Sequence, residues 1–216
     1  FNKKPNPRSF RTIDILKSVG AVIADGHFVG TSGRHMSIYV NKDNLLPHPK
    51  ETFEITKRLA EALKDLDIEV VAVPVVGGVI LGHLVAYHLS ILKGKEILSA
   101  YAEKTDEGPM VFKRGYDSLI KGKKVLIIDD TVATGFSVNK MLEVVRNFGG
   151  NIVAMGVIAN RVPKDINSDT LGINFSWLCE IPAETYDEKD CPFCKAGIPV
   201  NIKIGHGKKF LESKNR

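Results

Sequence analysis

Two adjacent aspartates follow a run of branched apolar residues near the middle of the chain. The stretch VLIIDDTVATGFSV, residues 125–138, places Asp129 and Asp130 directly after that run. A continuous apolar run is typical of a strand buried on both faces of a parallel sheet, here Lys123 to Asp129. Ligands of open parallel sheets bind beyond the carboxyl ends of the strands, so the two acids are expected at a binding edge.

The residues after the acids are expected to bind a phosphate. An apolar stripe at helical spacing predicts a helix from Ser137 to Phe148, with Ser137 as its N-cap. The loop Thr131 to Phe136 would then direct backbone N–H groups at one place, which favours an anion. Vicinal ribose hydroxyls can donate to the two carboxylates, and a divalent cation could neutralise the remaining charge. The combination indicates a ribose 5-phosphate, although a solvated strand-end acid stays open for either aspartate alone.

Composition narrows the class of protein. The chain has 216 residues, of which 44% are hydrophobic, enough for a full core in one domain. The net charge of +5 suits an anionic ligand, although ordinary surface charge is the commoner explanation for most basic residues. No basic stretch is interleaved with aromatic residues, so no nucleic acid is expected. Three cysteines and the lack of an apolar N-terminal segment predict a cytoplasmic location.

Strands and helices alternate along the chain. Val70 to Leu92 holds 23 residues without Asp, Glu, Lys or Arg, but Pro74 and two glycines interrupt it, so a strand and a helix are expected rather than a membrane span. The alternation predicts an α/β fold with a mostly parallel twisted sheet and helices on both faces. The expected strands are 68–73, 96–102, 123–129 and 152–160, and the expected helices are 10–19, 50–66, 79–92 and 137–148.

We expect a single domain over residues 1–216. Residues 1–48 would form an N-terminal helix and a hairpin hood, with the hairpin signal around Ser32 and Gly33. Residues 49–170 would form the α/β core. Residues 171–216, richer in Pro, Gly and Cys, would add a final strand and an irregular tail.

The string around the two acids resembles the phosphoribosyl pyrophosphate signature of the type I phosphoribosyltransferases. Four further segments resemble the orotate phosphoribosyltransferases. GHFVGTSGRHMSIYVNK (26–42) is similar to the hairpin that helps to bind the base, and VPVVGGVILG (73–82) to the pyrophosphate loop. YAEKTDEGPMVFKRG (101–115) is placed like the mobile catalytic loop, and CPFCKAGIPV (191–200) is similar to a C-terminal segment of some members.

The resemblance implies an enzyme. It would transfer the ribose 5-phosphate of phosphoribosyl pyrophosphate to orotate, giving orotidine 5'-phosphate and pyrophosphate in pyrimidine nucleotide synthesis. It would use Mg²⁺ and act as a homodimer whose loop reaches a neighbouring active site. Positive charge grows on the ribose and negative charge on the leaving pyrophosphate, so a cation should stabilise departure.

The resemblance also implies roles for individual residues. The catalytic set is Lys104, Asp129 and Asp130. The phosphoribosyl pyrophosphate set adds Gly77, Gly78, Lys113, Arg114, Thr131, Val132, Ala133, Thr134, Gly135, Phe136 and Ser137. The base-binding set is Arg161, Thr31 and Tyr39. Plainer interpretations stay open: surface charge for Lys104, Lys113, Arg114 and Arg161, and a simple turn for the two glycines.

Three positions depart from the family pattern. Ala133 stands where a Thr is usual, Phe136 replaces a small residue after the loop glycine, and Thr31 occupies the position of a base-binding Lys in some members. One alternative is therefore a phosphoribosyltransferase for a purine or another base. Another is a non-catalytic, nucleotide-sensing regulator of the same fold that binds RNA through its basic tail.

The cysteines raise a separate question. Cys191 and Cys194 form a C-x-x-C, and with Cys179 and His206 they make a C-x11-C-x2-C-x11-H series that could bind zinc tetrahedrally. A metal-free C-x-x-C is the favoured interpretation, with structural zinc as the alternative.

Overall fold

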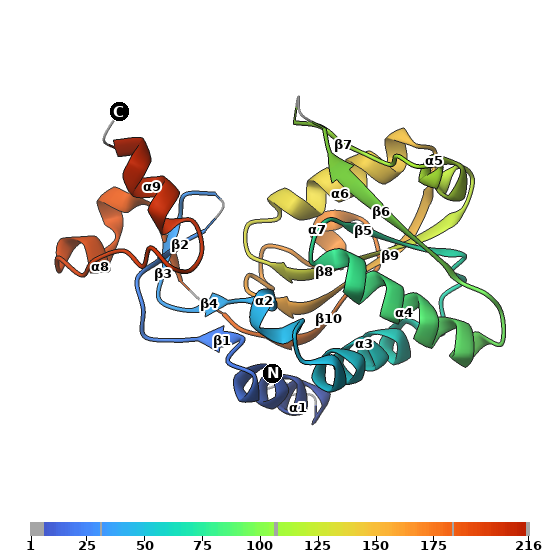
Figure 1. Ribbon diagram of the computed structural model, residues 1–216, viewed down its shortest axis with the longest axis horizontal. Helices are drawn as coiled ribbons and strands as arrows, with labels where there is room; N and C mark the ends of the chain where they lie inside the picture. Colours follow the sequence, from blue (N-terminus) through green and yellow to red (C-terminus); the bar gives the residue numbers. More distant parts are fainter. Residues whose placement is uncertain (1–6, 31, 106–107, 183, 215–216) are drawn as a thin grey trace.

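A six-stranded sheet forms the centre of the molecule (Figure 1). The computed structural model describes residues 7–30, 32–105, 108–182 and 184–214, with side chains from residue 11 onward. The strand order is β10-β9-β8-β5-β6-β7, and all neighbours are parallel except the short edge strand β7. The strands are β5 (Val70–Pro74), β6 (Leu98–Lys104), β7 (Met110–Val111), β8 (Lys124–Val132), β9 (Asn151–Asn160) and β10 (Phe175–Glu180).

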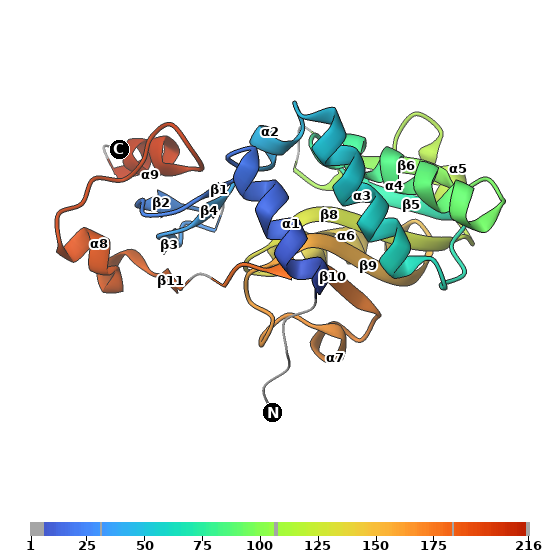
Figure 2. The same ribbon diagram turned by 90° about the horizontal axis from the view of Figure 1, so that it is seen from below.

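Helices cover both faces of this sheet, which confirms the predicted fold class. Side chains alternate along each strand: Val71 and Val73 of β5 join one apolar cluster, whereas Val70 and Ala72 join the other. Figure 2 shows α1 and α3 lying across the first face. That face carries α1 (Pro7–Ser18), α3 (Pro49–Leu63) and α4 (Gly78–Lys93), and the opposite face carries α5 (Tyr116–Ile120), α6 (Phe136–Asn147) and α7 (Ser168–Leu171).

The apolar stretch from Val70 to Leu92 is divided between β5 and α4, as the sequence predicts. Both elements contribute buried side chains to the first apolar cluster, among them Val73 and Val85. Gly82 of α4 lies so close to β5 that a Cβ there would meet Val73 Cγ1 at 2.3 Å. Within the described part of the chain, no helix is long and apolar enough to cross a membrane.

The N-terminal hairpin and the C-terminal tail meet beside the sheet (Figure 1). The predicted hairpin is present, since β2 and β3 pair antiparallel and β11 adds a third strand. The expectation of an irregular tail was wrong, because short helices follow β10 and pack against that hairpin. The elements are β1 (Val22–Ile23), β2 (Phe28–Val29), β3 (His35–Met36), β4 (Tyr39–Val40), α2 (Lys42–Leu45), β11 (Thr185–Tyr186), η1 (Glu188–Asp190), α8 (Pro192–Lys195) and α9 (Gly207–Lys214).

Candidate active site

Asp129 and Asp130 lie inside β8 and not beyond its end. The predicted strand end at Asp129 was wrong, because β9 continues to pair with β8 as far as Val132. On its other side β8 pairs with β5 only as far as Ile127, so the segment that carries the acids has an open edge toward β5. Asp129 is 7% exposed and the Asp130 side chain 16% exposed. The strand therefore holds both carboxylates rigidly at the carboxyl-terminal edge of the sheet.

Each carboxylate accepts a hydrogen bond from the backbone of the next residue. Asp130 N donates to Asp129 Oδ1 at 2.9 Å, and Thr131 N donates to Asp130 Oδ1 at 2.7 Å. Burial raises the pKa of Asp129 well above its ordinary value, and the negative charge of Asp130 raises it further. A buried acid beside a second acid is costly to ionise and marks a place where a ligand can supply compensating contacts.

Lys42 is a member of this site that the sequence analysis missed. Its Nζ lies 3.3 Å from Asp130 Oδ2, and the charge of Asp130 raises the pKa of Lys42. Lys42 begins α2, directly after β4, so the ion pair joins the N-terminal hairpin region to the central sheet. The available signal was its place as the last residue of the segment that resembles a base-binding hairpin.

Gly77 lies in a turn after β5, and the close approach of other residues explains why neither Gly77 nor Gly78 carries a side chain. Gly77 has a φ of −64°, which any residue can adopt, yet a Cβ there would lie 2.3 Å from Lys42 Cε. A Cβ on Gly78 would lie 3.1 Å from Val73 Cβ. The two glycines thus leave room for the Lys42 stem and keep the backbone of this loop accessible. The Val75–Val76 peptide bond in the same loop is cis.

The loop after β8 ends at Gly135, which caps α6 in the left-handed conformation with a φ of 75°. The prediction of Ser137 as the N-cap was wrong, because the left-handed glycine starts the helix one residue earlier, at Phe136. No described side chain caps the first N–H groups of α6, which remain available to an anion. Phe136 is 58% exposed, with Lys140 Nζ 4.4 Å above its ring, and so it does not fill the loop.

The other residues of the predicted loop, which the structure divides between the end of β8, the loop itself and the start of α6, differ in exposure. Thr131 and Ala133 are half-buried, Val132 and Gly135 are buried, and Thr134 and Ser137 are exposed. The mixture fits a loop whose backbone, more than its side chains, faces a ligand.

Arg161 is buried, which rules out the interpretation as a surface residue. It is 5% exposed, and burial lowers its pKa. Its Nη2 donates to the Ile38 carbonyl oxygen at 2.7 Å and its Nη1 contacts Met36 Sδ at 3.1 Å, so it ties β9 to the N-terminal hairpin. In the part of the chain that the structure describes, its Nε has no partner and no carboxylate pairs with the guanidinium. An uncompensated buried cation favours an anionic ligand.

Tyr39 in β4 lies in the same electrostatic neighbourhood. Burial raises its pKa, while the charges of Lys42 and Arg161 lower it and that of Asp130 raises it. Its ring packs against Phe28 at a centroid distance of 5.7 Å. Tyr39 is therefore close enough to Asp130 and Arg161 for both charges to affect its pKa. Thr31, the third predicted base-binding residue, lies outside the described residues.

The basic residues of the predicted catalytic loop are at the sheet's edge. Lys104 ends β6 and is exposed, and Met110 of β7 pairs with it, so β6 and β7 form a hairpin there. Because Ala102 pairs with Pro74, Lys104 projects from the same carboxyl-terminal edge as the acids, two strand spacings or about 10 Å from β8. Lys113 is exposed, and Arg114 Nε lies 3.7 Å from Glu103 Oε1.

The structure does not bring together the four residues that the sequence analysis gave as an alternative zinc set. Cys179 lies in β10 of the central sheet, where its Sγ donates to the Ile158 carbonyl oxygen at 3.4 Å and burial raises its pKa to about 12. His206 is exposed and lies outside the one candidate metal cluster found among the described residues. After β10 the chain leaves the sheet and carries Cys191 and Cys194 to the N-terminal hairpin, so Cys179 cannot reach them.

Comparisons with known proteins agree with this geometry. Residues 41–177 match the family model of the phosphoribosyl transferase domain. The chain is 36% identical over 197 residues to the orotate phosphoribosyltransferase of Thermotoga maritima, covering 91% of this chain and 98% of that protein. It belongs to the orotate phosphoribosyltransferase family. The enzyme of that name from Caldanaerobacter subterraneus is 34% identical over 187 residues, covering 87% of this chain and 92% of the relative.

Solved structures of phosphoribosyltransferases share the fold. An orotate phosphoribosyltransferase of Mycobacterium tuberculosis superposes with a TM-score of 0.62 at 18% identity, covering 81% of this chain and 97% of that one. An adenine phosphoribosyltransferase of Thermoanaerobacter pseudethanolicus superposes with a TM-score of 0.60 at 19% identity, covering 78% and 99%. The fold is thus common to enzymes named for different bases, and the sequence relatives place this chain in the orotate phosphoribosyltransferase family.

The raised pKa of Asp129 predicts a stability effect that depends on pH. Its unfolded pKa is about 3.9, so its contribution favours folding below that pH and is lost as the pH rises through the higher folded pKa. Asp129→Asn should therefore raise the free energy of unfolding at pH 7, with a difference from the wild type that shrinks toward pH 4. Urea unfolding across this pH range measures it. Asp117→Asn, at an exposed position on α5, controls for the loss of one charge; a destabilised Asp129→Asn at pH 7 would contradict the prediction.

Proposed function

We propose that this chain is an orotate phosphoribosyltransferase: it transfers ribose 5-phosphate from phosphoribosyl pyrophosphate to orotate and releases pyrophosphate. The observation that carries the proposal is the buried Asp129–Asp130 pair at the open edge of β8, in a chain of this family. The product, orotidine 5'-phosphate, places the reaction in pyrimidine nucleotide synthesis.

The sugar phosphate would lie across the end of β8. Ribose hydroxyls would donate to Asp129 and Asp130, whose lone pairs are not all used by the backbone. The 5-phosphate would accept hydrogen bonds from the backbone of residues 131–137, because the α6 N-terminus directs its free N–H groups there. This arrangement uses carboxylates for hydroxyls and amides for phosphate, so no group faces a partner of like charge.

The pyrophosphate would lie against the Gly77–Gly78 loop. The missing Cβ atoms let its oxygens approach the backbone, and Lys42 adds a cation that is already held at this position. Lys104, with Lys113 and Arg114 as additional contacts, would bring positive charge to the leaving group from β6 and the segment after β7. Closure of residues 104–115 over the site would exclude water from the activated sugar.

Magnesium fits the same place. Adjacent carboxylates supply the hard oxygen ligands that Mg²⁺ prefers. A bound cation would also offset the burial and the neighbouring charge of Asp130, which together raise the pKa of Asp129. Asp129 and Asp130 would hold the ion, directly or through water. When bound, Mg²⁺ neutralises charge on the pyrophosphate and so favours its departure.

Arg161 would select the base. Its buried guanidinium lacks a carboxylate partner in the described part of the protein, and orotate carries a carboxylate that such a planar donor can bind. Tyr39, beside Arg161, would contact the base as well, with Thr31 from the same hairpin segment. A base without the carboxylate would leave the buried cation unpaired, which gives a physical reason for discrimination.

We further propose that the whole chain acts as one cytoplasmic domain and that two copies associate. In the domain, residues 1–48 and 171–216 would cover the core of residues 49–170. The surface for association is an apolar stripe on α4, formed by Ile80, Tyr87 and Ile91, which are 46, 51 and 62% exposed. Phe53 of α3 extends it and packs against Tyr87. Apolar surface that one copy leaves exposed is typical of a subunit interface.

A base panel tests the proposed reaction. With phosphoribosyl pyrophosphate and Mg²⁺, orotate should release pyrophosphate at least about 100-fold faster than uracil, adenine or guanine, because only orotate pairs with Arg161. Turnover of a purine but not orotate would instead support the alternative that Ala133 and Phe136 leave open. Salt-sensitive RNA binding without pyrophosphate release from any base would support a regulator.

Arg161→Gln tests the base site. Losing a charge-assisted contact worth about 1.5–3 kcal/mol should raise the KM for orotate roughly 10- to 100-fold. The KM for phosphoribosyl pyrophosphate should change little, since that substrate is assigned to β8 and the glycine loop. Arg146→Gln, exposed on α6, is the matched control. Equal increases in both KM values would argue against a base-binding role.

The double variant Tyr87→Asp, Ile91→Asp tests the association surface. Sedimentation should show a dimer for the wild type and a monomer for the variant, because two carboxylates would be buried without partners. Ile202→Asp, at a 56% exposed position in the C-terminal tail, should remain dimeric. A monomeric wild type, or a dimeric double variant, would refute the proposed interface.

A further inference from the structure

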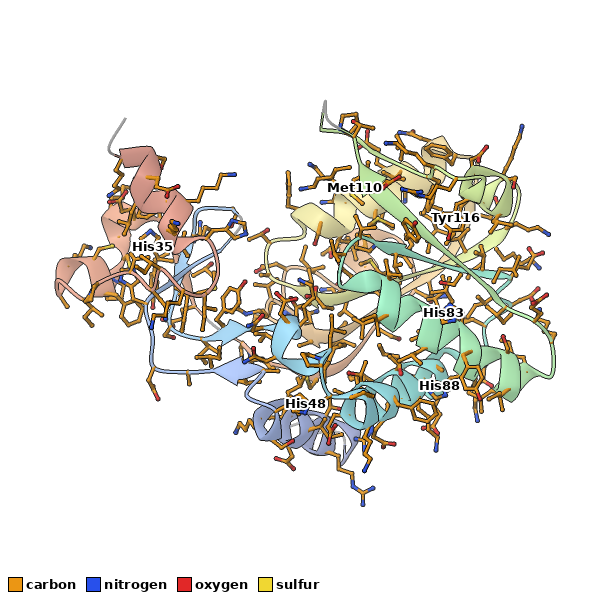
Figure 3. The ribbon with its side chains drawn as sticks, in the orientation of Figure 1. His35, His48, His83, His88, Met110 and Tyr116 are labelled. Carbon is orange, nitrogen blue, oxygen red and sulfur yellow. The ribbon has the colours of Figure 1, made fainter. Side chains whose placement is uncertain are left out.

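Four metal-binding side chains meet where the N-terminal hairpin contacts the C-terminal tail. They are His27, His35, Cys191 and Cys194, and each offers one ligand atom within 4.8 Å of the others. The two histidines are 2% and 0% exposed, and Cys191 is 0% exposed. His35 is labelled in Figure 3, beside the tail helices and apart from His48, His83 and His88. The three cysteines are not in disulfides.

The distances between these atoms fit a tetrahedral metal ion. Zn–S bonds of about 2.3 Å and Zn–N bonds of about 2.0–2.1 Å place neighbouring ligand atoms roughly 3.3–3.8 Å apart. His27 Nε2 lies 3.6 Å from Cys191 Sγ and 3.7 Å from Cys194 Sγ, and His35 Nδ1 lies 3.4 Å from Cys194 Sγ. The two ring nitrogens are 2.7 Å apart and need to separate by only about half an ångström.

We propose that His27 Nε2, His35 Nδ1, Cys191 Sγ and Cys194 Sγ bind a structural Zn²⁺. Two thiolates and two neutral imidazoles in a tetrahedron are a donor set that selects zinc among the divalent metals available to a protein. Two thiolate charges also balance the charge of the ion, so the buried site is electrically neutral. All four positions are filled by protein atoms, so the site is closed and has no place for a substrate.

Local structure prepares each ligand. Pro192 begins α8 directly after Cys191, and Cys194 follows within the same helical turn, which places both thiols on one side. His27 Nδ1 lies 2.7 Å from the Ile198 carbonyl oxygen and donates its proton there, which leaves the Nε2 lone pair free for a metal. A carbonyl behind a histidine ligand is the usual means of fixing its tautomer.

The surroundings shield three of the four groups from water, and Cys194 is half-buried. Phe193 of α8 packs against His27 at a centroid distance of 5.5 Å, and Phe210 of α9 packs edge-on against His35 at 4.8 Å. The backbone closes the same contact, since Asn201 N donates to the His27 carbonyl at 2.7 Å and His206 N donates to the Val29 carbonyl at 2.9 Å. Apolar walls around a closed set of thiols and imidazoles are typical of structural zinc sites.

This part of the protein needs such a site because its apolar core is small. The buried apolar residues here include Phe28, Val29 and Met36, and none of them belongs to the two large clusters that flank the central sheet. Small units that bury little apolar surface are commonly stabilised by a metal. Zinc would join the hairpin to the tail across more than 150 residues of sequence.

The zinc site is connected to the proposed base site through β3, and this part of the inference rests on the proposed function. His35 and Met36 are neighbours in β3, and Arg161 contacts Met36 Sδ and the Ile38 carbonyl. Fixing His35 therefore fixes the backbone that orients Arg161. We expect zinc to position the orotate-binding guanidinium without touching either substrate.

Metal analysis of the full-length protein tests the site. The chain purified under reducing conditions, or supplied with zinc and desalted, should hold close to one zinc ion. The double variant Cys191→Ser, Cys194→Ser should hold less than about one tenth of that, whereas Cys179→Ser, a buried thiol in β10, should hold a full equivalent. A wild type without zinc, or a double variant that retains it, would overturn the proposal.

Cobalt substitution gives a readout that does not depend on the variants folding. Co²⁺ added to the metal-free wild type should give the intense visible bands of tetrahedral coordination and a thiolate charge-transfer band, both lost when zinc is added. Octahedral spectra would overturn the site.

Removal of zinc should raise the KM for orotate at least about tenfold, with little change in the KM for phosphoribosyl pyrophosphate. Full zinc binding in a chain that turns over no base would instead refute the proposed function and leave the metal site standing.

Discussion

The carboxylate pair at the end of β8 is the constraint on which the rest of the site depends. Two neighbouring acids, one of them 7% exposed, can stay ionised only if other groups compensate their charge. The protein supplies two backbone N–H groups and the ammonium of Lys42. These contacts require that β8 extends further than its pairing with β5 and that Gly77 has no side chain. They also require that the N-terminal hairpin region lies against the sheet. The length of β8, the glycines of the loop after β5 and the position of the N-terminal hairpin region therefore all serve to compensate the charge of Asp129 and Asp130.

The central fold could be predicted because its signals are local. Apolar strands and amphipathic helices alternate at their own periods, and buried positions such as Val71 and Ile127 fall where those periods place them. The ends of the helices and strands were harder to predict, because pairing with a neighbouring strand determines them. Pairing with β9, for example, extends β8 beyond Asp129. The C-terminal tail was misjudged for a related reason. Its helices are too short for a periodic pattern, and contacts with the distant hairpin stabilise them.

The residues of the candidate site also divide into those with a local sequence signal and those without one. Asp129, Asp130 and the paired glycines could be predicted because their order and spacing along the chain are characteristic. Lys42 could not, since a lysine after a hairpin has no local signal and its role comes from Asp130 and Gly77, both far away in sequence. The four proposed metal ligands include residues of both kinds. The C-x-x-C was visible, whereas His27 and His35 look like ordinary hairpin residues until folding brings them to the cysteines.

Three of the polar contacts that tie the N-terminal hairpin region to the rest of the chain are Lys42 to Asp130, Arg161 to Ile38, and the histidine–cysteine cluster. Two of them use groups that we propose to bind substrates, so substrate binding would act on the hairpin's attachment. A sugar phosphate on Asp130 would compete with Lys42 for that carboxylate. Orotate on Arg161 would give a buried cation the counter-charge that it lacks among the described residues. The third contact is closed to substrates. A metal ion in this cluster would hold the hairpin and the tail together while the other two contacts exchange partners. The stability of the hairpin region would then not depend on the substrates bound beneath it.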